Sequence, residues 1–116
     1  MLLQQIGVSV GPGQEAAFES ALLEVRDRLV MCVGFRGFTV AQDAETRTDY
    51  LVQIRWETAE ELTQCVESGR FARAWSPVDG HRVGPLRADH LLERPTLGFH
   101  GRGVLTDLSW ASEAPG

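Results

Sequence analysis

The 116-residue sequence contains no lysine and no asparagine, so arginine supplies all 11 of its basic side chains. Without lysine the chain can form neither the Schiff base of an ordinary pyridoxal-phosphate enzyme nor the phosphate contact of a P-loop. Without asparagine, any mechanism that needs a side-chain amide has to use a glutamine.

Positive charge is also scarce, because 16 acidic residues give the chain a formal net charge of -5. The arginines are scattered and interleaved with acids, whereas binding to nucleic acid needs clustered cations. The three histidines show no paired spacing of the kind that metal ligands adopt. We therefore expect no nucleic-acid partner and no resident metal.

Cysteine is limited to Cys32 and Cys65, whose spacing fits neither a zinc ribbon nor a thioredoxin motif. One disulfide could join them, but we expect two reduced, buried thiols, because the first residues do not resemble an export signal. No apolar run approaches the ~18 residues of a membrane-spanning helix. The sequence thus predicts a cytoplasmic protein without a membrane partner.

Hydrophobic periodicity and turn residues divide the chain into seven elements. The strands are expected at residues 2–10, 34–40, 50–56 and 86–94. The helices are expected at residues 14–30, 59–67 and 70–75. Thr58 and Glu61 have the spacing of a capping box at the start of the second helix. A short additional strand could form at 104–108.

This order of elements, β-α-β-β-α-β, predicts an α+β protein of the ferredoxin-like type, with a four-stranded antiparallel sheet and helices on one face. Residues 1–95 form the domain, and residues 96–116 form a tail that could close over a pocket or clasp a partner subunit. The strand at 50–56 is partly apolar on both faces, so the face without helices predicts a homodimer. Gln53 and Arg55 are expected at that interface.

Four segments of the sequence carry a family resemblance: PGQE at 12–15, GFRGF at 34–38, VQIRWETAEE at 52–61 and SGRF at 68–71. Together they resemble the antibiotic biosynthesis monooxygenase family of dimeric α/β barrels, over roughly residues 5–94. The resemblance implies a homodimeric enzyme with an apolar pocket between sheet and helices. It further implies cofactor-free oxygenation of a planar aromatic or polyketide-derived small molecule in secondary metabolism.

The positions best known in this family hold other residues here. The quinone-forming branch has an asparagine four residues before the strand tryptophan and a tyrosine six residues after it. Counted from Trp56, those positions are Val52 and Leu62. In the haem-degrading branch the pocket tryptophan and the iron-ligand histidine fall at Cys65 and Trp75. The sequence therefore argues against haem degradation by the usual ligands.

Three residues are candidates for catalysis. His90 could take a proton from a phenol or enol if its strand face turns toward the helices, or it could lie in the dimer interface. His81 could be a base oriented by Asp79, or an exposed residue of an ordinary turn. Trp56 could shield a planar ligand from water, or simply anchor a helix. His100, in the glycine-rich tail, is expected to be exposed or interfacial.

A further group of residues is expected at the pocket wall. Tyr50 could donate a hydrogen bond to a ligand carbonyl and Arg73 could stabilise an enolate at the rim, although each also fits a structural role. The candidates for substrate binding are Tyr50, Val52, Ile54, Leu62, Phe71, Arg73 and Trp75. Three functions stay open: a monooxygenase, a non-redox polyketide cyclase or isomerase, and a ligand-binding accessory protein without catalysis.

Overall fold

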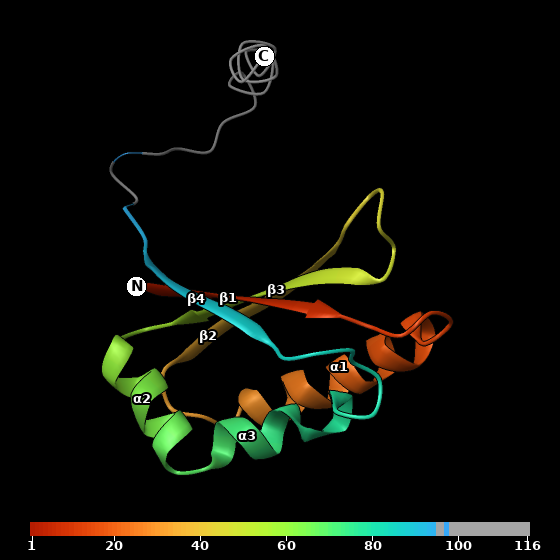
Figure 1. The fold of residues 1–116 in the computed structure, drawn as a ribbon. Helices are drawn as coiled ribbons and strands as arrows, with labels where there is room; N and C mark the ends of the chain where they lie inside the picture. Colours follow the sequence, from red (N-terminus) through yellow and green to blue (C-terminus); the bar gives the residue numbers. More distant parts are fainter. Residues whose placement is uncertain (95–96, 98–116) are drawn as a thin grey trace.

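The computed structural model describes residues 1–94 and residue 97, and its elements follow the predicted order (Figure 1). His100 and the strand expected at 104–108 lie outside the described residues. The strands are β1 (Leu2–Ser9), β2 (Phe35–Gln42), β3 (Asp49–Trp56) and β4 (Arg87–Leu92). The helices are α1 (Glu15–Leu29), α2 (Ala59–Glu67) and α3 (Arg70–Trp75), followed by the 3-10 turn η1 (Ser76–Val78).

The four strands form one antiparallel sheet in the order β2-β3-β1-β4. All three helices lie on the same face of this sheet (Figure 1). This arrangement confirms the predicted ferredoxin-like α+β fold. On β1, Leu2 pairs with Trp56 on one side and with Leu92 on the other. Residues directly opposite each other in antiparallel strands have their side chains on the same face of the sheet. Every second residue of β1 counted from Leu2 is buried, so these residues and their partners on β3 and β4 lie on the face that carries the helices.

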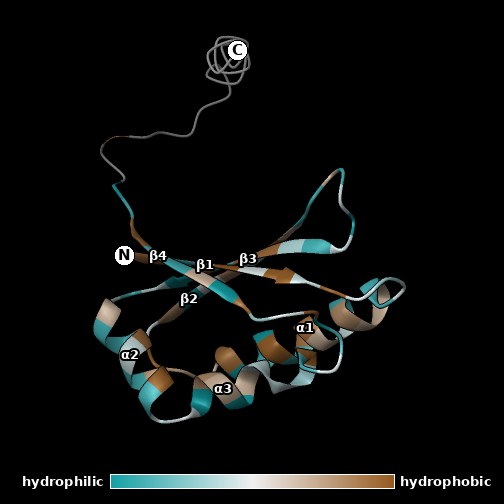
Figure 2. Ribbon diagram, in the orientation of Figure 1, coloured by the Kyte–Doolittle hydropathy of each residue, from teal (hydrophilic) through white to brown (hydrophobic). Residues whose placement is uncertain are grey.

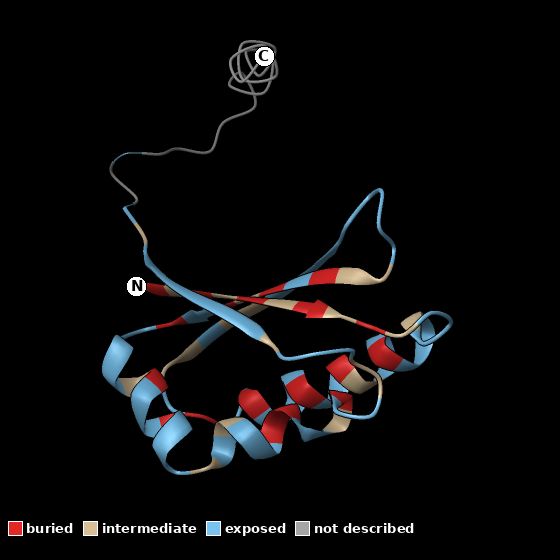
Figure 3. Cartoon of the chain, in the orientation of Figure 1, coloured by how far each residue is buried: buried red, intermediate tan, exposed pale blue. Residues whose placement is uncertain are grey.

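The buried residues of the hydrophobic core, red in Figure 3, come mainly from the central strands of the sheet and from the helices. Burial alternates along β1 and β3, as expected for strands with one covered face. Helix α1 contributes a stripe of four buried residues at helical spacing: Phe18, Leu22, Val25 and Leu29. Apolar residues, brown in Figure 2, accordingly recur along α1 and β1. The core thereby fixes which side chains of the central strands point to the helices.

Strand β4 differs from the central strands because all six of its residues are exposed (Figure 3). Ala88, His90 and Leu92 lie on the helix face of the sheet, opposite buried residues of β1. The helices therefore cover β1 and β3 but leave the helix face of β4 accessible to solvent.

The opposite face of the sheet has no helix over it among the described residues. Leu51 and Leu91 are exposed there, and Gln53 and Arg55 lie on this face as the sequence predicts. Arg55 forms an ion pair with Glu93, just after β4. The face thus combines exposed leucines with side chains that already have polar partners.

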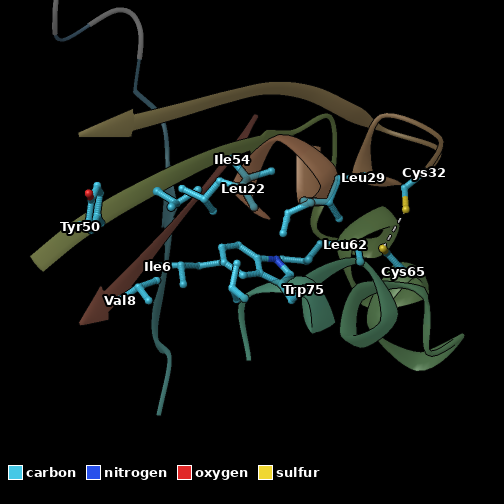
Figure 4. Packing of buried hydrophobic residues seen from close by; sticks show 14 of the residues in the cluster. Ile6, Val8, Leu22, Leu29, Cys32, Tyr50, Ile54, Leu62, Cys65 and Trp75 are labelled. Carbon is cyan, nitrogen blue, oxygen red and sulfur yellow. Dashed lines mark hydrogen bonds between the residues drawn. The ribbon is translucent and has the colours of Figure 1, made fainter. Parts of the chain in front are cut away.

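Cys32 and Cys65 are buried free thiols, and their Sγ atoms lie 3.0 Å apart (Figure 4). Cys32 follows α1 and Cys65 belongs to α2, so the contact joins two helical segments that are distant in sequence. Burial, together with the hydrogen bond to Cys32, raises the pKa of the Cys65 thiol. These thiols match the prediction of two buried cysteines without a disulfide.

The predicted capping box at α2 forms in part. The Thr58 hydroxyl accepts a hydrogen bond from the backbone N–H of Glu61 at 3.2 Å, as predicted. The Glu61 carboxylate, however, accepts from the Thr58 hydroxyl at 3.1 Å. The glutamate thus bonds the capping side chain and not the capping backbone, so one orphan N–H of the first turn is satisfied by this pair.

We expect Thr58→Ala to lower the free energy of unfolding by about 1 kcal/mol, because α2 loses its N-terminal acceptor. The matched control is Thr63→Ala within the same helix, where the hydroxyl donates to the carbonyl of Ala59 and caps nothing. The control should change the unfolding free energy by less than about 0.5 kcal/mol. Urea unfolding followed by circular dichroism measures both values, and equal losses would contradict the capping role.

Candidate functional site

A chain of three polar groups crosses the helix face of the sheet from β3 through β1 to β4. Its centre is Gln4, the only buried polar residue of residues 1–94. The Gln4 Oε1 accepts a hydrogen bond from Trp56 Nε1 at 3.1 Å, and its Nε2 lies 3.3 Å from His90 Nε2. In the sheet, Gln4 of β1 is paired with His90 of β4 on one side and with Ile54 of β3 on the other. The strand register therefore brings the indole, the amide and the imidazole together.

Trp56 is fully buried, and its indole contacts the ring of Phe35 edge to face with centroids 6.1 Å apart. A buried indole N–H needs an acceptor, and here Gln4 provides it. The structure therefore gives Trp56 the position of a core residue, one of the two alternatives stated for it. Trp56 is a core residue, and its one polar atom connects the core to the exposed edge of the helix face.

The register settles which face His90 occupies. Its partner Gln4 lies beneath the helices, so His90 is on the helix face and not on the open face of the sheet. Because no helix covers β4, His90 is nevertheless exposed. A small molecule can thus reach an imidazole whose orientation is held from the core.

His81 lies elsewhere, on the loop after η1. Of the two alternatives for His81, the pair with Asp79 does not form: the Asp79 carboxylate accepts from Arg82 Nε at 3.3 Å, while His81 Nδ1 lies 2.9 Å from Gln14 Oε1. Arg82 stands three residues after Asp79, close enough in a turn to take the carboxylate. Arg82 forms an isolated bridge with Val10, just after β1 and six residues from Gln4, which places His81 on the order of 20 Å from His90.

A second polar group lies at the other end of the helix face, around Tyr50. The Tyr50 hydroxyl donates to Glu19 Oε2 at 2.6 Å and accepts from Gln42 Nε2 at 3.2 Å. Burial raises the pKa of Tyr50 to about 12, and the Glu19 carboxylate adds to this effect. Tyr50 therefore stays protonated at neutral pH and acts as a hydrogen-bond donor.

This tyrosine lines a hollow of about 430 Å³ between α1 and strands β2 and β3. Its apolar wall includes Leu22, Phe38 and Val40, and its polar end is Tyr50 with Glu19. The volume falls within the ~300–1,000 Å³ typical of small-molecule sites. Tyr50 lies six residues along β3 from Trp56, so this polar end of the hollow is separated from the indole by roughly 20 Å.

The other predicted binding residues do not line this hollow. Phe71 is partly buried and contacts Trp75, with ring centroids 6.2 Å apart, and Arg73 is exposed on α3. Trp75 packs beneath the sheet near Ile6 and Leu62 (Figure 4). Four of the predicted binding residues are buried in the core: Val52, Ile54, Leu62 and Trp75.

Three polar residues of these groups were not singled out from the sequence: Gln4, Glu19 and Gln42. For Gln4 a signal was present, because it occupies an apolar face of β1 between Leu2 and Ile6. A polar side chain at such a position has to find a buried partner. For Glu19 and Gln42 the sequence carried no comparable signal, since both residues are ordinary on an amphipathic helix or at a strand end.

In the part of the chain that the structure describes, no group of three or more His, Cys, Asp or Glu side chains is placed to hold a metal ion. Within residues 1–94, every helix is too short or too polar to cross a membrane.

Solved structures with the same fold are similar to this chain. A candidate antibiotic biosynthesis monooxygenase from Bordetella bronchiseptica has a TM-score of 0.72 and 23% identity, covering 81% of this chain and 98% of its own. SnoaB, a cofactor-independent oxygenase from Streptomyces nogalater, has a TM-score of 0.70 and 16% identity, covering 83% and 95%. A candidate antibiotic biosynthesis monooxygenase from Deinococcus radiodurans has a TM-score of 0.73 and 13% identity, and the match covers 87% of this chain and 100% of that one. At these identities the likeness shows the fold.

Among proteins with curated functions, none matches the sequence significantly. The family model for antibiotic biosynthesis monooxygenases matches residues 1–75, which is more than half of the 116-residue chain and includes both Gln4 and Trp56. The chain therefore belongs to the antibiotic biosynthesis monooxygenase family.

Proposed function

We propose that this protein is a cofactor-independent monooxygenase acting on a planar aromatic or polyketide-derived small molecule of secondary metabolism. The observation that carries the proposal is the Trp56–Gln4–His90 chain, which ends in an exposed imidazole on the helix face. Family membership and the structural likeness to SnoaB, a cofactor-independent oxygenase, support the reaction class.

The proposed reaction needs no cofactor because the substrate supplies the electrons. A phenol conjugated with a ring CH₂ group loses a proton, and the resulting anion transfers one electron to O₂. The radical pair then recombines at the ring carbon. The O–O bond breaks, CH₂ becomes C=O, and the second oxygen atom leaves as water with both hydrogens. In this scheme His90 contacts the substrate oxygen on which charge develops.

His90→Ala should lower kcat roughly 100-fold, because the anion loses its polar contact. The matched variant is His81→Ala, which removes the same side chain about 20 Å away and should leave kcat unchanged. Oxygen uptake measured together with quinone formation from an anthrone tests both variants. Conversion of an anthrone-type or polyketide substrate that proceeds equally without oxygen would contradict the monooxygenase and favour a cyclase or isomerase.

A second candidate function, ligand binding without catalysis, is favoured by the hollow between α1 and β2. This hollow is large enough for a small molecule and offers a protonated tyrosine at its polar end. An accessory protein would use it to hold a planar metabolite, with Tyr50 donating to a ligand oxygen in place of Glu19. Binding that survives His90→Ala and is lost in Tyr50→Phe would support this function.

The titration of Tyr50 tests the polar end of the hollow directly, since the chain contains a single tyrosine. Absorbance at alkaline pH should give a midpoint near 12, against the ordinary value of 10.0. Glu19→Gln should lower the midpoint, because the carboxylate disfavours the phenolate. Glu24→Gln, on the same helix, is the control. A midpoint near 10 in the native protein would show that the hydroxyl is solvated.

The same shift predicts how stability depends on pH. Because the pKa of Tyr50 is raised in the folded state, its stabilising contribution is complete below the unfolded value of 10.0. That contribution is lost as the pH rises toward 12. Denaturant unfolding between these two values should thus show a smaller loss of stability in Tyr50→Phe than in the native protein.

We also propose that two copies of the chain pair through the open face of the sheet. Support comes from the exposed Leu51 and Leu91 on a face without helices. A second copy would bury both leucines and leave the Arg55–Glu93 ion pair intact.

Sedimentation equilibrium should give twice the 12.8 kDa of the chain. The double variant Leu51→Arg/Leu91→Arg should be monomeric, because it would bury unpaired charge. The control is Val66→Arg on the exposed side of α2, which should stay dimeric. A monomer for the native protein at micromolar concentration would overturn this assembly.

A further inference from the structure

The hydrogen-bond chain across the helix face has a direction that chemistry dictates. An indole N–H can only donate, so the Gln4 atom facing Trp56 has to be the carbonyl oxygen. The amide nitrogen of Gln4 therefore faces His90, with 3.3 Å between the two nitrogen atoms. The buried indole thus decides the orientation of an amide whose two ends would otherwise be interchangeable.

The orientation of the amide in turn decides the state of the imidazole. An amide NH₂ group can only donate, so His90 Nε2 has to accept and carries no proton. In a neutral imidazole the proton then resides on Nδ1. No described residue forms a hydrogen bond with Nδ1, and His90 is exposed.

We propose that Gln4 is a positioning residue that holds His90 in the Nδ1–H tautomer, so that His90 offers a hydrogen-bond donor to an anionic oxygen of a ligand. This deepens the proposed function and rests on it for the identity of that oxygen, a phenolate or enolate. His90 then stabilises the anion and does not accept its proton, which leaves to the solvent that reaches β4.

The reverse orientation of the Gln4 amide is disfavoured at the end that faces Trp56. Turning the Gln4 amide over would set its NH₂ group against the indole N–H and would leave a buried donor without an acceptor. A carboxylate at this position would do the opposite of the amide, since it accepts from both neighbours. It would keep the bond to Trp56 and draw a proton onto His90 Nε2. Gln4→Glu is therefore a variant of nearly identical shape with the opposite expected tautomer.

The first test uses the native protein without substrate. In ¹⁵N-labelled protein at a pH where the ring is neutral, His90 Nδ1 should resonate in the protonated range and Nε2 in the unprotonated range. The His90→Ala spectrum identifies the signals. A proton found on Nε2, or rapid averaging between the two tautomers, would overturn the proposal.

The second test compares Gln4→Glu with Gln5→Glu. Gln5 is the next residue of β1 and lies on the opposite face, so it introduces the same charge without reaching His90. Gln4→Glu should move the His90 proton to Nε2, whereas Gln5→Glu should leave it on Nδ1. An unchanged tautomer in a folded Gln4→Glu protein would refute control by Gln4. If that variant does not fold, the spectrum of the native protein still decides the proposal.

Activity separates this inference from the proposed function. If both hold, Gln4→Glu should lower kcat roughly 100-fold with a smaller effect on KM, because the lost contact acts on the developing anion. A native Nδ1–H tautomer combined with full oxygenase activity in His90→Ala would confirm the positioning by Gln4 and contradict the proposed reaction site.

Discussion

The pairing register of β1 determines which side chains can meet on this sheet. β1 is bonded on both sides, to β3 and to β4, and its alternate residues are the ones beneath the helices. A slip of one residue would turn Gln4 toward the open face and bring Gln5 into the core. The contacts of Trp56 and His90 with the same amide both depend on this register. The core residues of β1 keep it in place, because a slip would expose Ile6 and Val8.

Because the helices leave β4 uncovered, the buried amide of Gln4 can contact a residue at the surface. Trp56 is fully buried, so an unpaired indole N–H would be costly there, while β4 is uncovered. Gln4 stands between them and satisfies the indole with one end and reaches the exposed imidazole with the other. A polar chain that began and ended in the core would only stabilise the fold. This one couples the core to an accessible ring.

The sequence predicts the architecture well because its local signals agree with each other. The predicted boundaries of α2 and α3 match the structure, and the strand order follows from the order of elements. The site is a different matter, since it depends on pairing between strands far apart in sequence. The face that His90 occupies is set by its pairing with Gln4, 86 residues away. For Asp79 and His81, proximity in sequence suggested a pair, but Arg82 competes for the carboxylate and prevails.

The lack of asparagine takes on a structural meaning at Trp56. The family resemblance places an amide four residues before this tryptophan on the same strand, where the chain has the fully buried Val52. An amide nevertheless lies against the indole, and it comes from the neighbouring strand β1. An amide at position 52 would lie on β3, the strand of Trp56 itself. Gln4 instead lies on β1, between β3 and β4, and its amide contacts both Trp56 and His90. Because the amide comes from β1, it connects Trp56 to His90. An amide at position 52 would be two strands away from that histidine.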